Sequence, residues 1–394
     1  MRLFFSVGEP SGDLHGANLI GELQKRAPLS AAGLGGPKMR SAGCELLRDM
    51  SDLAVMGLAP VLAKLPEFFR LLARVERAFD EQRPEAVVLI DYPGFNWHVA
   101  RKAKERGIPV FYYGLPQLWA WATWRVKKVR RYVDHALCKL PFEEPWFRAH
   151  GCNATYVGHP YFDELRQQRL DDSFIQSASV PPGRLVTILP GSRTHEVRNN
   201  LPQLLRSAAI VRREVVDVRF AIASYNERQA ALAEQLVSTA NVPAEIHVGR
   251  TPELISAAHC CLACSGSVSL ELLFHAKPSV IVYRVPWLTY KVVGRIFNAR
   301  YITLVNLLAS QEPLDRFKKC DEQPVLPEFP TWRDCSTEVA GHASEWLRNE
   351  PRRQELISRL IELREQVANG GASAVAAEYI VSQLCEPNRL RRAS

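Results

Sequence analysis

Short, almost continuous apolar runs alternate with longer amphipathic segments along most of the chain. Such runs predict parallel β-strands covered by helices on both faces, because a strand buried on both sides needs no polar alternation. In the first half the runs are Leu3–Val7, Ala86–Ile90, Val110–Tyr113, Ala136–Cys138 and Ala154–Val157. In the second half they are Leu185–Leu189, Arg219–Ala223, Ala244–Val248, Cys260–Cys264 and Val280–Tyr283. The alternation therefore predicts an α/β protein with two doubly wound, Rossmann-like domains that face a cleft.

The amphipathic segments and the composition of the connections predict the domain boundaries. Helices are expected at Asp13–Arg26, Leu65–Gln82, Asn96–Arg106, Gln354–Ala368 and Ser373–Cys385. The segment 166–183 is rich in Gln, Ser, Asp and Pro and is expected to be a linker. We therefore predict an N-terminal domain over 1–165, a C-terminal domain over 184–350, and a helical C-terminal tail over 351–394. Ligands of such folds bind beyond the carboxyl ends of the strands.

The composition adds a net charge of +8, from 50 Lys and Arg against 42 Asp and Glu in 394 residues. This balance favours anionic partners such as phosphates, nucleic acid or an anionic membrane surface. The sequence contains no run of about 20 apolar residues that could span a membrane, and its first residues do not resemble a secretion signal. Nine cysteines without framework spacing fit reduced thiols. We expect a cytoplasmic protein in which Cys261 and Cys264 belong to a buried strand.

The loop Gly8–Gly16 directly follows the first predicted strand. Its glycines permit a tight turn, and Ser11 or Asp13 could cap the next helix. The free N–H groups at that helix start could hold an anion or a hydroxyl, so Ser11, Gly12 and Asp13 are candidate acceptor-binding residues. The spacing is not that of a dinucleotide loop, and an ordinary strand-to-helix turn explains it as well. A second glycine loop, Gly33–Met39, is equally open between a turn and a site.

Asp91 stands at the end of the strongest apolar run in the first half. A carboxylate at the carboxyl edge of a strand can act as general base on a hydroxyl, so Asp91 is a candidate catalytic residue. Asn96 could cap the following helix and is a further candidate acceptor-binding residue. The alternative is a capping aspartate that takes no part in chemistry.

The loop after the predicted strand at 185–189 is suited to a diphosphate. Gly191 and Ser192 expose backbone donors, and Arg193 adds a guanidinium that can grip phosphate oxygens. The loop is not a Walker loop, because no Gly-Lys-Ser/Thr follows. An ordinary turn that caps a helix remains the alternative.

A second loop of this kind opens a helix after the predicted strand at 260–264. Ser265, Gly266 and Ser267 offer hydroxyls and N–H groups at a helix start, where the helix dipole favours negative charge. Glu271 could accept hydrogen bonds from ribose hydroxyls. A serine-rich helix cap without a ligand explains the same residues.

A tryptophan-rich segment runs directly into a cluster of cations. Its aromatic residues are Trp119, Trp121 and Trp124, and its cations are Arg125, Lys127, Lys128, Arg130 and Arg131. Stacking aromatics with cations would suit nucleic acid, and interfacial tryptophans with a polybasic face would suit an anionic bilayer. Apolar stretches at 57–72 and Trp287–Tyr301 favour the membrane, so no nucleic-acid partner is expected. The alternative is a solvated basic helix beside a tryptophan-rich core.

Taken together, these segments resemble a known family. The motifs GEPSGDLHGA, GGPKM, MGL, IDYPGFN, WAW, LPFE, VGHP, PGSRTHE, SGSVSLE and VNLLA occur in order between Met1 and Phe317. In this set the sequence resembles the lipid-A-disaccharide synthases. The resemblance implies an inverting GT-B glycosyltransferase that moves 2,3-diacylglucosamine from UDP to the 6-hydroxyl of 2,3-diacylglucosamine 1-phosphate. It also implies a peripheral protein on the inner face of the cytoplasmic membrane.

The resemblance assigns roles to single residues. By resemblance, Asp91 becomes the candidate base and Asn306 a residue near the nucleotide. Arg193, whose guanidinium suits a diphosphate, is the candidate catalytic cation at the leaving group. One displacement at the anomeric carbon needs a base and a stabilised leaving group. Because no aspartate pair for a metal stands at the predicted strand ends, we expect neither a metal nor another cofactor. The sequence is compatible with a homodimer.

The sequence departs from the family pattern mainly in the first domain. Gly94 stands where the family usually has aspartate, and Pro10 where it usually has alanine. The segment 114–118 lacks the usual Ser-Pro-Ser or Ser-Pro-Gln, and Pro60 and the segment 312–317 also differ. A related GT-B transferase with a different glycolipid acceptor therefore stays open. A UDP-sugar epimerase and a non-enzymatic basic adaptor are the remaining alternatives.

Overall fold

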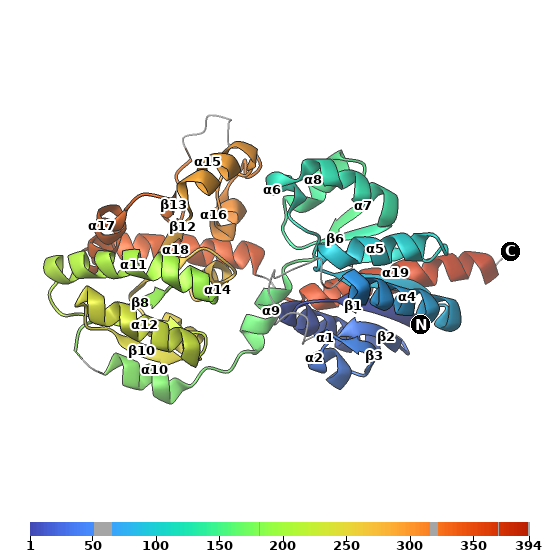
Figure 1. The fold of residues 1–394 in the computed structure, drawn as a ribbon, viewed down its shortest axis with the longest axis horizontal. Coiled ribbons are helices and arrows are strands. Elements are labelled where there is room, and N and C mark those ends of the chain that lie inside the picture. Colours follow the sequence, from blue (N-terminus) through green and yellow to red (C-terminus); the bar gives the residue numbers. More distant parts are fainter. Residues whose placement is uncertain (51–64, 181, 316–321, 369, 393–394) are drawn as a thin grey trace. The chain divides into compact units, whose positions relative to one another are not determined.

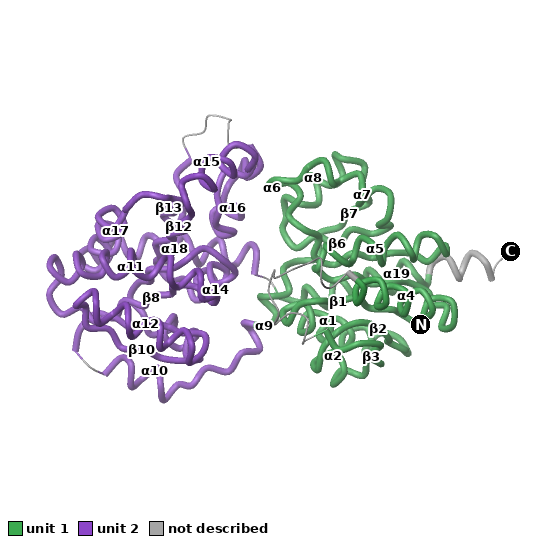
Figure 2. The backbone as a smooth tube through the Cα atoms, in the orientation of Figure 1, with its two compact units in different colours: residues 1–164, 370–394 green, residues 165–369 purple. Residues whose placement is uncertain are grey.

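In a computed structural model the chain forms two compact units (Figure 2). The structure describes residues 1–50, 65–180, 182–315, 322–368 and 370–392. Unit 1 combines residues 1–164 with 370–394, and unit 2 consists of residues 165–369. The first half of the apolar segment 57–72 lies outside the described residues, as do the MGL motif and Pro60, and the second half belongs to the helix Leu65–Gln82. The chain therefore completes unit 2 before it returns to unit 1 for its last helix.

Unit 1 is built on a seven-stranded sheet whose neighbouring strands are all parallel (Figure 1). In chain order the strands are β1 (Arg2–Val7), β2 (Ser30–Gly35), β3 (Cys44–Asp49), β4 (Ala86–Ile90), β5 (Val110–Tyr113), β6 (His135–Cys138) and β7 (Ala154–Tyr156). Their order across the sheet is β3-β2-β1-β4-β5-β6-β7. The apolar runs predict all of these strands except β2, whose residues are small, and β3, which is mostly half-buried.

Helices cover both faces of this sheet. The helices of unit 1 are α1 (Pro10–Gln24), α2 (Pro37–Ser41), α4 (Leu65–Gln82), α5 (Pro93–Lys104), α6 (Leu118–Trp121), the 3₁₀ turn η2 (Thr123–Arg125), α7 (Val126–Tyr132), α8 (Glu143–Ala149) and α19 (Ala372–Arg392). Helix α9 (Pro160–Gln167) runs from unit 1 into unit 2. One face packs on α4 and α5 through residues such as Phe79 and Val99. The other packs on α1 and α19 through Leu19 and Ile380. This double coverage explains why the strands consist of continuous apolar runs.

Unit 2 repeats the architecture with a six-stranded parallel sheet in the order β10-β9-β8-β11-β12-β13. Its strands are β8 (Arg184–Leu189), β9 (Val218–Ser224), β10 (Glu245–Val248), β11 (Cys260–Cys264), β12 (Ser279–Arg284) and β13 (Glu328–Thr331). Its helices are α10 (Asp172–Ser179), α11 (Thr194–Glu214), α12 (Glu227–Ala240), α13 (Thr251–Ala257), α14 (Val268–Phe274), α15 (Trp287–Ile296), α16 (Leu304–Ala309), α17 (Ser336–Arg348) and α18 (Glu350–Val367). Cys261 and Cys264 are buried in β11, as predicted.

The unit boundaries differ from the predicted ones at both ends of unit 2. The expected linker contains α10, which is joined to α13 by an ion pair between Asp171 and Arg250 with a distance of 2.9 Å. The two C-terminal helices belong to different units, with α18 in unit 2 and α19 in unit 1. Asp163 fixes the start of α19 by accepting backbone hydrogen bonds from Gly371 at 2.5 Å and Ser373 at 3.0 Å. An amphipathic pattern predicts such a helix but not the surface on which it packs.

Both sheets reverse their strand order at a strand that carries a candidate loop. In unit 1, β1 lies between β2 and β4, and in unit 2, β8 lies between β9 and β11. At a reversal of strand order, the connections of two neighbouring strands run to opposite faces of the sheet. The loops at the carboxyl ends of these two strands therefore separate and leave a crevice in which ligands bind. The loops after β1 and β4, and those after β8 and β11, occupy this position.

Candidate active site

The backbone of Asp91 is held in an unusual conformation at the end of β4. Asp91 and the next residue, Tyr92, both have φ of 46°, in the left-handed region that side chains rarely adopt. The Asp91 carbonyl accepts hydrogen bonds from Tyr112 Oη at 2.7 Å and from Asn96 Nδ2 at 2.8 Å. The Tyr92 ring covers Gly8, where an added Cβ would lie 2.2 Å from a ring carbon. The loops after β1 and β4 therefore fit together only because residue 8 is glycine.

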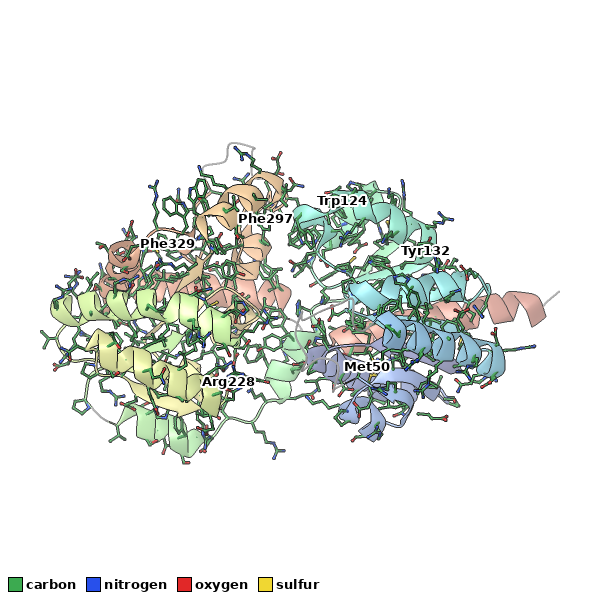
Figure 3. The ribbon with its side chains drawn as sticks, viewed as in Figure 1. Met50, Trp124, Tyr132, Arg228, Phe297 and Phe329 are labelled. Carbon is green, nitrogen blue, oxygen red and sulfur yellow. The ribbon has the colours of Figure 1, made fainter. Side chains whose placement is uncertain are left out.

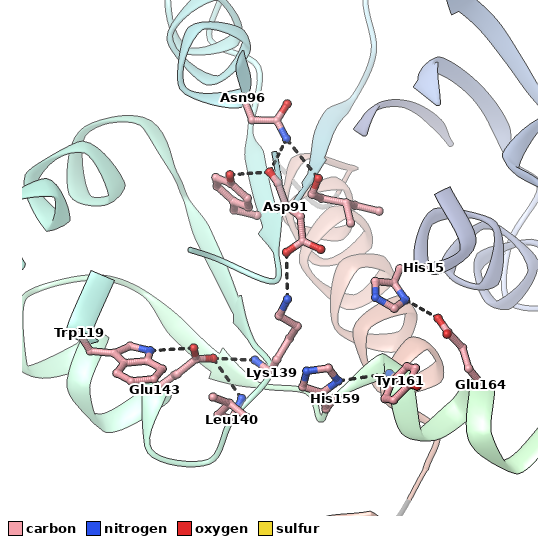
Figure 4. A network of polar contacts seen from close by, with 12 residues as sticks. His15, Asp91, Asn96, Trp119, Lys139, Leu140, Glu143, His159, Tyr161 and Glu164 are labelled. Carbon is pink, nitrogen blue, oxygen red and sulfur yellow. Dashed lines mark hydrogen bonds and ion pairs between the residues drawn. The ribbon is translucent and has the colours of Figure 1, made fainter. Parts of the chain in front are cut away.

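The Asp91 carboxylate forms an ion pair with Lys139, the first residue after β6 (Figure 4). The distance from Oδ1 to Nζ is 2.9 Å. Burial alone would lower the pKa of Lys139, but the nearby carboxylates of Asp91 and Glu143 outweigh it and raise that pKa. Lys139 passes close to Gly114, where φ is +72° and a Cβ would lie 2.9 Å from Nζ. Lys139 is therefore a cation, placed directly against the candidate base.

Two histidines lie in the same polar network as this ion pair (Figure 4). His159 follows β7, and burial, together with the charges of Lys139 and His15, holds the pKa of His159 well below its usual value. His159 is therefore neutral, and its Nδ1 accepts a hydrogen bond from the Tyr161 backbone N–H at 3.3 Å. His15 Nδ1 lies 2.8 Å from Glu164 Oε1, in an orientation that forms no hydrogen bond.

Lys139, His159 and His15 are not among the site residues predicted from the sequence. A usable signal exists for Lys139, because an ionisable residue directly after a predicted strand lies at the ligand-binding edge. His159 stands two residues after the predicted run at 154–157, within the VGHP motif. His15 lies inside α1, and its place beside Glu164 follows only from the tertiary fold.

Asn96 has a structural task that differs from the predicted one. Helix α5 begins at Pro93, so Asn96 lies inside its first turn and does not cap it. The side chain is fully buried, and its Oδ1 accepts from Ser6 Oγ at 2.7 Å while Nδ2 donates to the Ser6 carbonyl at 3.2 Å. Asn96 thus ties β1 to the end of β4 and orients the Asp91 backbone.

Asp13 also differs from its predicted role as a cap of α1. Its carboxylate accepts hydrogen bonds from the backbone N–H groups of Gly36 at 2.7 Å, Lys38 at 3.0 Å and Met39 at 3.1 Å. These groups belong to the start of α2, so Asp13 joins the two glycine loops that the sequence analysis treated separately. Of the other predicted acceptor-binding residues in this loop, Ser11 is exposed and Gly12 is buried.

The first candidate diphosphate loop is tightly built and leaves Arg193 accessible. Gly191 has φ of +117°, and a Cβ there would lie 2.6 Å from the Cβ of Glu196. Glu196 accepts from the Arg193 backbone N–H at 3.1 Å and from its guanidinium at 3.1 Å. The carbonyl of Ser192 accepts a hydrogen bond from the buried Gln229 side chain. The Arg193 side chain is nevertheless 72% exposed, so its guanidinium stays accessible from solvent while it is paired with Glu196.

The second candidate loop follows β11, the strand that pairs with β8. Ser265 is half-buried, Gly266 and Ser267 are exposed, and Glu271 is buried within α14. Asn200 connects this loop to the first, because its Nδ2 donates to Cys264 Sγ at 3.2 Å and to the Pro190 carbonyl at 3.4 Å. Both loops thus lie side by side at one edge of the sheet.

Asn306, expected near the nucleotide, is buried in α16. Its Nδ2 donates to the Leu326 carbonyl at 2.8 Å and to Glu328 Oε2 at 2.9 Å, and its Oδ1 accepts from the Leu326 N–H at 2.9 Å. Burial raises the pKa of Glu328, against the hydrogen bonds that it accepts. In this structure Asn306 fixes the segment that leads into β13.

The tryptophan-rich segment divides into a buried and an exposed part. Trp119 is 2% exposed and donates its indole N–H to Glu143 Oε1 at 3.0 Å, so the prediction that it contacts a membrane is wrong. Trp121 and Trp124 are 46% and 61% exposed, and the Arg125 guanidinium lies 5.5 Å and 5.9 Å from their ring centres. The other predicted cations, Lys127, Lys128, Arg130 and Arg131, are exposed on α7. Among the described residues, no helix has the length and apolar character needed to cross a membrane.

Solved structures define the class to which this architecture belongs. The UDP-GlcNAc 2-epimerase of Neisseria meningitidis, bound to UDP-GlcNAc, aligns with a TM-score of 0.61 and 12% identity over 98% of this chain and all of that one. A UDP-glucosyltransferase from Polygonum tinctorium aligns with a TM-score of 0.59 and 12% identity over 98% of each chain. At this identity the likeness concerns the fold alone, and it is the GT-B fold, as predicted.

Sequence relatives identify the family within this class. A sequence model of the lipid-A-disaccharide synthetase family matches residues 3–359. The lipid-A-disaccharide synthase of Anaeromyxobacter dehalogenans (strain 2CP-C) is 35% identical over 384 residues, which are 96% of this chain and 97% of that protein. The chain belongs to the lipid-A-disaccharide synthetase family and is a glycosyltransferase. The family match decides against the epimerase and adaptor alternatives.

Proposed function

We propose that this enzyme transfers 2,3-diacylglucosamine from UDP to the 6-hydroxyl of 2,3-diacylglucosamine 1-phosphate, with inversion. The observation that carries the proposal is the placement of Asp91 and of both candidate diphosphate loops at the strand-order reversals of their sheets. This is where doubly wound folds bind their ligands. Family membership supplies the identity of the substrates.

The proposed reaction is a single displacement. The acceptor 6-oxygen forms a bond to the anomeric carbon while the bond from that carbon to the diphosphate oxygen breaks. Asp91 accepts the hydroxyl proton, and UDP leaves with the bonding electrons. Lys139 keeps the Asp91 carboxylate in place before the proton arrives. Arg193 and the polar groups of Ser192, Ser265 and Ser267 stabilise the charge on the departing diphosphate.

Replacement of Arg193 by alanine is expected to weaken UDP binding by about tenfold or more, since a hydrogen bond to a charged group contributes about 1.5–3 kcal/mol. Isothermal titration calorimetry with UDP measures the effect. Arg212→Ala, at the other end of the same helix, is the matched control and should bind UDP as the wild type does. Equal affinity for wild type and Arg193→Ala would remove Arg193 from the diphosphate site.

The same proposal places the enzyme on an anionic membrane surface at the inner face of the cytoplasmic membrane. Exposed Trp121 and Trp124 next to the cations of α7 support this, because each basic residue near such a surface contributes about 1 kcal/mol. Replacing Arg125, Lys127, Lys128, Arg130 and Arg131 by glutamine should release the protein from vesicles that contain phosphatidylglycerol.

The control for this release experiment replaces an equal number of exposed arginines in unit 2. These are Arg212, Arg213, Arg348, Arg352 and Arg359, each changed to glutamine. Because both variants lose the same net charge, a difference in sedimentation with vesicles reports the place of the cations and not their number. If both variants stay bound, or both are released, α7 is not the membrane-binding surface.

The alternative to this proposal is a transferase that uses the same donor but a different glycolipid acceptor. Gly94 is exposed, and a Cβ added there would meet no atom within 4 Å, so the carboxylate usual in the family would fit but is missing. Incubation of the enzyme and UDP-2,3-diacylglucosamine with 2,3-diacylglucosamine 1-phosphate, and separately with the phosphate-free sugar, tests this by mass spectrometry. The proposal requires product with the phosphorylated acceptor. Product with another glycolipid alone would support the alternative transferase.

A further inference from the structure

Helix α15 of unit 2 is an apolar helix with little cover from the rest of its unit (Figure 1, Figure 3). Every one of its residues is at least partly exposed. Its large apolar side chains and their exposed fractions are Trp287 53%, Leu288 64%, Tyr290 38%, Val292 50%, Val293 43% and Ile296 48%. Contiguous apolar surface of this kind marks an interaction site rather than the scattered apolar residues of an ordinary surface.

The charged side chains on α15 itself are all of one sign. Lys291 and Arg295 are exposed on the helix, and neither forms an ion pair with any residue that the structure describes. The sequence contains no aspartate or glutamate between Val285 and Gln311. Tryptophan and aliphatic side chains combined with unpaired cations are the composition of helices that lie in the interface of anionic bilayers.

The helix also starts at the ligand-binding edge of its sheet. It follows β12, which pairs with β11, so α15 leaves the same edge that carries Ser265–Ser267. The end of β12 is fixed to the first diphosphate loop, because the Arg284 backbone N–H donates to Asn200 Oδ1 at 3.0 Å. A lipid held by its nucleotide at these loops would therefore be bound at the same edge of the sheet from which α15 starts.

We propose that α15 is an interfacial helix by which unit 2 inserts into an anionic bilayer beside the nucleotide loops. It gives unit 2 a membrane contact separate from the surface on α6–α7 of unit 1. The inference rests on the proposed use of a UDP-linked lipid donor, which must be taken from a bilayer while its uridine diphosphate stays in water. The side chains enter the acyl boundary, and Lys291 and Arg295 contact lipid phosphates.

The test uses the full-length protein and vesicles of phosphatidylcholine with and without phosphatidylglycerol. Leu288→Ser, Val292→Ser and Ile296→Ser, combined in one variant, remove apolar surface from successive turns of α15. The control combines Val180→Ser, Val216→Ser and Val375→Ser, which are apolar positions elsewhere with exposed fractions of 79%, 79% and 45%. A second variant, Lys291→Gln with Arg295→Gln, removes only the charge. Calorimetry with water-soluble UDP confirms that each variant is folded.

The proposal predicts that the triple α15 variant partitions onto anionic vesicles at least tenfold more weakly than wild type, while the control binds as wild type does. The charge variant should lose binding to anionic vesicles and keep the weak binding to neutral ones. Wild-type partitioning of the α15 variant would overturn the proposal. If the α15 variant partitions onto vesicles as the wild type does but differs from it in oligomeric state on light scattering, the proposal is also overturned, because α15 would then be covered by a second copy of the chain.

The outcome is separable from that of the proposed function. If the wild type makes disaccharide from detergent-dispersed substrates but the α15 variant still binds vesicles normally, the interfacial helix is refuted and the transferase stands. If the wild type makes no disaccharide but its vesicle binding depends on α15, the proposed transferase activity is refuted and the interfacial helix stands.

Discussion

Replacing Asp91 by asparagine is expected to lower kcat by about a hundredfold or more, the lower end of what a positioned base contributes. Asparagine preserves the shape of the side chain and leaves the hydrogen bonds of Tyr112 and Asn96 to the residue 91 carbonyl intact. It cannot accept the proton of the acceptor hydroxyl. Since Asp91 and the UDP loops belong to different units, UDP affinity should change little. Initial rates and UDP calorimetry measure the two quantities.

Asp134→Asn is the control for this substitution. Asp134 also forms a close ion pair with a lysine, at 2.6 Å from Lys104, but it precedes β6 and so lies at the opposite edge of the sheet. The control therefore also loses a carboxylate–lysine ion pair, together with the hydrogen bond that Asp134 accepts from the Val110 backbone N–H at 2.8 Å. If Asp91→Asn retains turnover within a factor of ten of the control, the proton goes to another group.

Replacing Asp13 by alanine is expected to lower the free energy of unfolding by about 3 kcal/mol, because buried N–H groups would lose a charged acceptor. The three donors are the backbone groups of Gly36, Lys38 and Met39. Urea unfolding, followed by circular dichroism, measures the change. Asp13 is 6% exposed, so water does not readily replace the carboxylate.

Ser11→Ala separates this structural role from substrate binding in the same loop. Ser11 is exposed, and its loss should change the unfolding free energy by less than about 0.5 kcal/mol. If Asp13→Ala unfolds at the same urea concentration as wild type but loses acceptor affinity, the three hydrogen bonds contribute little and Asp13 belongs to the binding site as first predicted.

The apolar runs predicted the central strands because a strand that is buried on both faces has an apolar side chain at nearly every position. The same reasoning missed β2, β3 and β13, the last of which is half-buried or exposed along its length. β2 packs closely enough against β1 to need Gly33, where a Cβ would lie 2.0 Å from the Phe5 carbonyl oxygen, so small residues replace the apolar ones. The sequence also did not predict that α19 packs on unit 1, because an amphipathic helix can pack on any apolar surface.

The position of the site was more predictable than the tasks of its side chains. A polar residue after a predicted strand is expected at the carboxyl edge of the sheet, and in the structure Asp91 follows β4 and Arg193 lies in the loop after β8. Whether such a residue meets a ligand or the backbone depends on partners distant in sequence. Asp13 and Asn96 look like site residues in sequence, yet their polar atoms are engaged by α2 and by β1. Lys139 becomes a candidate site residue only because the fold brings it against the Asp91 carboxylate, 48 residues earlier in the chain.

The linkage formed by the wild-type enzyme tests the account most directly. UDP-2,3-diacylglucosamine and 2,3-diacylglucosamine 1-phosphate are incubated with the protein, and the product is analysed by nuclear magnetic resonance. A single displacement on the α-linked donor predicts a β-1,6 disaccharide, with one UDP released per linkage. An α-linkage, a bond to another hydroxyl, or release of UDP without a disaccharide would contradict it.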